Sequence, residues 1–154
     1  MKKLLFTLLT VISTTAFSQY TETESSFSKT FTQLRTYERP EGAEDWIYSG
    51  GDFVIWTLSL NVDFFACPGC RTQRGVMMAN AAGESKFFLS YLGQLREGED
   101  SYGDYNAYYV DILSYEAGKW DVWDSGEFRY YGNFAMLYVH NPSTFRFDYF
   151  NIKD

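Results

Sequence analysis

Tyr108-Tyr109-Val110-Asp111-Ile112-Leu113 opens the stretch that decides the fold, which continues to Ile152. Three turn-forming sequences divide this stretch into short runs of aromatic and β-branched residues: Glu116-Ala117-Gly118-Lys119, Asp124-Ser125-Gly126 and Asn141-Pro142-Ser143-Thr144. Such runs between turn signals are typical of consecutive antiparallel strands. The stretch therefore predicts a sheet, and the rest of the chain must supply the strands that cover it.

The preceding part of the chain contains further β-prone runs, which predict strands over Phe31–Tyr37, Phe53–Ala66, Arg71–Asn80 and Lys86–Leu95. A turn is predicted at Ser49-Gly50-Gly51-Asp52, and a long acidic loop over Arg96–Asn106. The alternation of apolar residues slips near Asp63, which predicts a bulge or a change of sheet there.

Phe134–Val139 is apolar on both faces, which indicates a central strand covered on each side. The same alternation predicts that Phe128, Tyr130 and Phe134 share one face of a continuous run. The expected fold class is all-β, an antiparallel two-sheet β-sandwich. A closed lipocalin-like β-barrel with an apolar cavity is the alternative, because both folds need many short strands.

The closing strands carry a resemblance to a known family. The residues concerned are Gly118-Lys119-Trp120, Gly132–Val139 and Phe147-Asp148-Tyr149-Phe150-Asn151-Ile152. This part of the chain resembles the last strands of concanavalin A-like jelly-roll domains in secreted bacterial proteins. The family commonly has Asn where this chain has Tyr149. The resemblance implies a sandwich of jelly-roll type and carbohydrate binding.

The first residues have the features of a secretory signal peptide. Met1-Lys2-Lys3 is basic, Leu4–Ile12 is mostly apolar, and Ala16-Phe17-Ser18 is a small-x-small cleavage site. The sequence predicts a signal peptide over residues 1–18, a single domain over residues 19–154, and export to the periplasm or the extracellular medium.

The charge of the chain bears on its partners. The chain has 13 Lys and Arg against 20 Asp and Glu, and loss of Lys2 and Lys3 would widen the difference. An acidic chain without a basic stripe is a poor ligand for nucleic acid or for anionic membranes. No later segment is long and apolar enough to be a membrane helix, so no membrane insertion is predicted.

Cys67-Pro68-Gly69-Cys70 contains both cysteines of the chain. Pro followed by Gly predicts a type II turn, which brings the two cysteines within disulfide range. We expect a disulfide that clasps a hairpin tip. A thiol oxidoreductase site is the alternative, although no βαβ pattern surrounds the motif. Arg71 follows Cys70 where haem attachment would need histidine.

Other chemistry finds little support in the sequence. His140 is the only histidine, so a zinc site or a nucleophilic triad lacks partners. Carboxylates that could act in a glycosidase are Glu97, Glu99, Asp100, Asp121 and Asp124, but the Glu-x-Asp-x-Glu motif of jelly-roll glucanases is absent. Weak candidates for calcium are Asp100, Asp104 and Asp148. No metal and no cofactor are predicted.

Aromatic residues make up 20% of the chain, and alternation cannot bury all of them. The candidates for an exposed ligand-binding surface are Tyr102, Tyr105, Tyr109, Trp123, Tyr130 and Tyr131. The expected function is an exported, non-catalytic binding domain, with a glycan or an envelope protein as partner. The alternatives are a secreted enzyme, of glycosidase or thiol oxidoreductase type, and a lipocalin-like carrier of apolar ligands.

Overall fold

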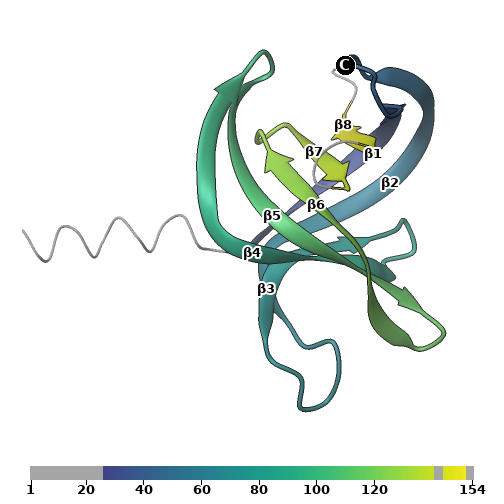
Figure 1. Cartoon of the computed structure of the whole chain (residues 1–154). Helices are drawn as coiled ribbons and strands as arrows, with labels where there is room; N and C mark the ends of the chain where they lie inside the picture. Colours follow the sequence, from purple (N-terminus) through teal and green to yellow (C-terminus); the bar gives the residue numbers. More distant parts are fainter. Residues whose placement is uncertain (1–25, 141–143, 152–154) are drawn as a thin grey trace, which may run out of the picture.

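The computed structural model describes residues 26–140 and 144–151, and every regular element in them is a strand. Each strand pairs antiparallel with the next, and the last pairs with the first, so the sheet closes into a barrel (Figure 1). The strands are β1 (Phe27–Glu38), β2 (Ile47–Phe64), β3 (Gln73–Ala79), β4 (Ser85–Asp100), β5 (Gly103–Glu116), β6 (Lys119–Tyr130), β7 (Phe134–Val139) and β8 (Phe145–Phe150).

The prediction of a two-sheet jelly-roll sandwich is wrong, and the alternative of a closed barrel holds. The decisive pairing is that of Gln33–Glu38 in β1 with Phe145–Phe150 in β8, which leaves one continuous sheet. The sandwich was expected because the alternation of apolar and polar residues shows only that a strand has one buried face. It does not show whether the sheet closes on itself. Strands as long as β2, with 18 residues, and β4, with 16, can tilt and coil around an axis, and register shifts in both help them bend.

Alternate side chains of the strands fill the barrel interior. Several partly buried rings pack against this core, among them Trp56, Tyr108 and Tyr130. The buried core residues are Phe31, Leu58, Leu60, Val76, Met78, Leu89, Val110, Ile112, Phe128, Ala135, Leu137, Val139 and Tyr149. Large apolar side chains therefore occupy the inside of the barrel.

β7 is buried on both faces, as the sequence predicted. Ala135 and Leu137 point into the barrel, while Met136 is covered on the outside. The prediction that Phe128 shares a face with Phe134 is wrong, because a turn over residues 131–133 separates β6 from β7. Phe128 pairs instead with Leu137.

Two predicted breaks are strands in the structure. Ser49–Asp52 lies within β2, and the predicted acidic loop forms the ends of β4 and β5, which meet in a turn at Ser101 and Tyr102. Glycine and acidic residues suggested a loop because both are depleted in strands. Here Glu97, Glu99 and Asp104 lie exposed on a hairpin that extends past the barrel wall and curves back toward the turn between β6 and β7 (Figure 1).

Two glycines allow neighbouring strands to approach closely. A Cβ atom at Gly126 would lie 1.8 Å from the carbonyl oxygen of Tyr138, and one at Gly75 would lie 1.9 Å from that of Leu89. These distances leave no room for any side chain, so both positions require glycine.

The disulfide between Cys67 and Cys70 is confirmed, with a Cα–Cα distance of 5.2 Å. The amide of Cys70 donates a hydrogen bond to the carbonyl oxygen of Cys67, and Gly69 has a φ of 80°. These features are those of the predicted type II turn. The clasp closes the loop between β2 and β3.

Candidate functional site

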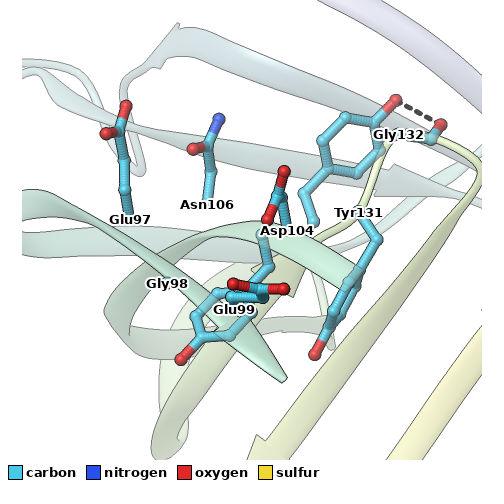
Figure 2. A pocket seen from close by; sticks show the side chains of 9 residues that line it. Glu97, Gly98, Glu99, Asp104, Asn106, Tyr131 and Gly132 are labelled. Carbon is cyan, nitrogen blue, oxygen red and sulfur yellow. Dashed lines mark hydrogen bonds between the residues drawn. The ribbon is translucent and has the colours of Figure 1, made fainter. Parts of the chain in front are cut away.

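A groove of about 680 Å³ lies where the β4–β5 hairpin leaves the barrel, beside the end of β6. Its polar side chains come mainly from the hairpin, and Figure 2 shows those of Glu97, Asp104 and Asn106 projecting to the same side. The residues that line it are Glu97, Gly98, Glu99, Asp104, Tyr105, Asn106, Tyr130, Tyr131 and Gly132.

The strand register builds the groove as rows of side chains. Glu97 pairs with Asn106, and Asn106 pairs in turn with Tyr130, so these three residues form one row across β4, β5 and β6. Glu99 and Asp104 form the next row on the same face. The side chain of Tyr130 lies on the same face of β6 as that of Phe128, which points into the barrel. The row of Glu97, Asn106 and Tyr130 therefore lies at the open end of the barrel, beyond the apolar core.

Tyr130 connects the groove to the barrel. Its ring contacts that of Phe27 at a centroid distance of 5.4 Å, and its hydroxyl donates a hydrogen bond of 2.8 Å to the carbonyl oxygen of Gly132 (Figure 2). Burial raises the pKa of the Tyr130 hydroxyl. The ring is therefore held in place between the core and the groove, with its hydroxyl neutral.

Asp100 ties the tip of the hairpin to the end of β6. Its carboxylate accepts hydrogen bonds from the Tyr131 hydroxyl at 2.6 Å, from the Tyr102 amide at 2.8 Å and from Arg129 at 3.1 Å. Burial on its own would raise the pKa of Asp100, but these hydrogen bonds and the Arg129 charge outweigh it and hold the pKa below its ordinary value. The curvature of the hairpin is thus fixed by charged contacts.

Glu127 anchors the base of the same hairpin. Glu127 is 4% exposed. Its carboxylate forms ion pairs with Arg129 on the same strand and with Arg96 on β4, the latter at 3.0 Å. The Arg96 guanidinium also lies 4.0 Å from the ring centre of Tyr109. A buried carboxylate needs such partners, because an unpaired one would carry the full cost of desolvation.

Gly98 lets the ring of Tyr105 lie flat against β4. A Cβ atom there would come within 2.5 Å of the Tyr105 ring. The Arg129 guanidinium covers that ring at 4.6 Å from its centre, and the Tyr131 ring lies 5.4 Å away from it. The aromatic wall of the groove is therefore fixed by packing before any ligand arrives.

The structure brings together four of the six aromatic residues predicted to bind ligand. Tyr105, Tyr130 and Tyr131 line the groove, and Tyr102 packs on Tyr131 at 6.3 Å between ring centres. Tyr109 lies under Arg96, and Trp123 packs on Phe87 at 6.3 Å, so neither lines the groove.

Asn106, Arg129 and Gly98 were missed as site residues. Nothing in the local sequence marks them, because their role depends on pairing between strands that the sequence predicted as a loop.

The carboxylates singled out for catalysis or calcium are divided among several places. Glu97, Glu99 and Asp104 line the groove, while Asp121 pairs with Lys119 and Asp148 with Arg146. Asp124 pairs with His140 at 2.9 Å. No group of three or more potential metal ligands occurs within residues 26–140 and 144–151, and no helix there could cross a membrane.

No protein family matches the chain, and neither a curated protein nor a solved structure is significantly similar to it. The class of the protein follows from the fold alone: it is an eight-stranded antiparallel β-barrel with a disulfide-clasped loop. Such a barrel is compatible with the lipocalin-like carrier alternative. The disulfide points to an oxidising environment, as exported proteins meet. The predicted signal peptide, residues 1–18, lies outside the described residues.

Proposed function

We propose that this protein is an exported, ligand-binding barrel whose ligand occupies the groove at the end of β6. The observation that carries the proposal is the row Glu97–Asn106–Tyr130, which places a carboxylate, an amide and a tyrosine side by side in a concave site. Convergent polar groups beside aromatic rings are typical of small-molecule sites. We place the protein in the periplasm or outside the cell.

The chemistry of the lining favours a saccharide. Carboxylate oxygens accept hydrogen bonds from hydroxyl groups, and the Asn106 amide both donates and accepts. Tyr130, in the same row as Asn106, adds a ring that can pack on the apolar face of a sugar. The exposed carboxylates of Glu97, Glu99 and Asp104 would repel an anionic ligand. A neutral, hydroxyl-rich ligand meets all of these conditions.

The position of the groove favours binding at the mouth of the barrel over binding inside it. Lipocalin-like carriers hold a ligand in the barrel interior. Here Phe31, Leu58 and Phe128 are among the core side chains that fill that space. An apolar ligand would have to displace them. The closed barrel nevertheless makes an apolar-ligand carrier the second candidate, and the experiment includes it.

The test is a screen of the folded protein against a glycan array, followed by calorimetry on each hit. Binding of a fluorescent fatty-acid probe tests the second candidate, a carrier of apolar ligands. Asn106→Ala and Tyr130→Ala should abolish glycan binding. Gln94→Ala, an exposed position on the same hairpin outside the groove, is the matched control and should leave it unchanged. Fatty-acid binding without glycan binding would select the carrier instead.

A further inference from the structure

We propose that the first half of β2 is a docking edge for an extended polypeptide strand of neutral or basic character. β2 pairs with β1 from Ile47 to Leu60, whereas its pairing with β3 starts only at Thr57. On the side away from β1, no described residue pairs with Ile47–Trp56. Figure 1 shows this part of β2 along the outside of the barrel. Its free backbone donors and acceptors form a template for one more strand.

Exposed apolar side chains are concentrated on this edge. Phe53 is 76% exposed, Tyr48 58%, Ile47 55% and Ile55 42%. Among the residues that the structure describes, four of the twelve large hydrophobic side chains with high exposure thus lie within nine consecutive positions. Scattered exposed hydrophobic residues need no explanation, but a group of them along an open strand edge marks an interaction site.

Two other open edges of the barrel are protected by charge. The end of β4 beyond its pairing with β3 carries Arg96, Glu97, Glu99 and Asp100, and the start of β6 carries Lys119, Asp121 and Asp124. Charged side chains on an edge are the usual defence against unwanted strand pairing. Ile47–Trp56 has Asp52 as its only charged residue. The β2 edge therefore lacks a protection that these edges of β4 and β6 have.

The charge around the edge decides between possible occupants. The loop before β2 exposes Glu41, Glu44 and Asp45, and Asp52 is exposed within the strand. A second copy of this chain, with a net charge of −7, would bring like charges together. An extended segment with apolar residues at alternate positions and no net negative charge avoids this repulsion. Its backbone would pair with β2 while its apolar side chains cover Phe53 and Ile55.

The probe for the test is a fluorescently labelled, soluble ten-residue peptide in which Val alternates with Lys and Thr. Binding to the full chain is followed by anisotropy and by hydrogen exchange. The peptide should bind and slow exchange of the amides in Ile47–Ile55. The same peptide N-methylated along its backbone should not bind, because it lacks the donors that strand pairing requires.

Two substitutions that each add one positive charge test whether the peptide binds at β2. Phe53→Lys should weaken peptide binding by about tenfold or more, whereas Val122→Lys, at another exposed apolar position, should leave it unchanged. Ile55→Lys replaces Phe53→Lys if circular dichroism shows that the latter is misfolded. Equal weakening by both lysine variants, retained binding of the N-methylated peptide, or protection outside β2 would overturn the proposal. Protection of β2 that rises with protein concentration alone would assign the edge to a second copy and would also overturn it.

Discussion

The Tyr131 hydroxyl donates a 2.6 Å hydrogen bond to the Asp100 carboxylate, which joins the end of β6 to the tip of the β4–β5 hairpin 31 residues earlier. The Tyr131 ring lines the groove, and Asp100 also holds Arg129, which covers Tyr105. One carboxylate therefore holds Tyr131 directly and Tyr105 through Arg129, and these are two of the three tyrosines that line the groove.

Loss of this contact should destabilise the hairpin more than the barrel. We expect Asp100→Asn to lower the free energy of unfolding by about 1–2 kcal/mol, since it removes charge-assisted hydrogen bonds at a partly exposed site. Tyr131→Phe should cost less, because it removes one of the three donors to Asp100. Denaturant unfolding measures both, and amide exchange should quicken in residues 97–106 first. Unchanged exchange in that segment would contradict the proposed role of Asp100.

Stability should fall in acid partly through Asp100. The pKa of this group is lower in the folded protein than in the unfolded chain. Its contribution is therefore complete above the unfolded pKa, about 4, and is lost as the pH falls through the lower, folded pKa. Between about pH 5 and pH 3, the wild type should lose more stability than Asp100→Asn does. Parallel curves for the two proteins would show that Asp100 does not contribute.

Gly126 should be the least replaceable of the glycines in β6 and its neighbours. Gly126→Ala forces a methyl group against the backbone carbonyl of Tyr138, and no side-chain rotation relieves that contact. We expect a loss of about 2–4 kcal/mol in the free energy of unfolding, or failure to fold. Gly50→Ala is the control, because a Cβ atom there meets nothing within 4 Å. A small loss at Gly126 would mean that β6 and β7 lie further apart than described.

The disulfide should contribute modestly to stability. Replacing both Cys67 and Cys70 by Ser should cost about 2 kcal/mol at most, since the closed loop is short and Pro68-Gly69 already favours the turn. The protein should contain no free thiol under non-reducing denaturation. A reduction potential near those of dithiol oxidoreductases, with exchange activity lost in the double serine variant, would support the redox alternative instead.

Much of the strand content follows from the sequence, because apolar alternation and turn residues are local signals. The Glu116–Lys119 turn and the Cys67–Cys70 clasp are such cases, and in the first Ala117 and Gly118 adopt the positive φ values that a tight hairpin needs. Closure of the barrel is not local. It depends on the pairing of β1 with β8, at opposite ends of the chain, which no short pattern reports.

The candidate site was predictable only in part. Tyr105, Tyr130 and Tyr131 attracted attention as surplus aromatic residues, and they do line one groove. Asn106 was not recognised, because its alignment with Glu97 and Tyr130 arises from the register of three strands. Acidic residues interrupted by Gly98 and Gly103 look like a solvated loop unless their long-range partners, such as Arg129, are known.

The most direct test of the central claim is an NMR titration of the isotopically labelled protein with the best glycan from the array. The claim predicts that the side-chain amide of Asn106 and the backbone amides of residues 97–106 and 130–132 shift together and saturate with one affinity. The amides of Cys67 and Cys70, at the clasped loop between β2 and β3, should not move. Saturable shifts confined to core residues such as Leu58 and Phe128, with the groove unaffected, would contradict the claim and place the ligand inside the barrel.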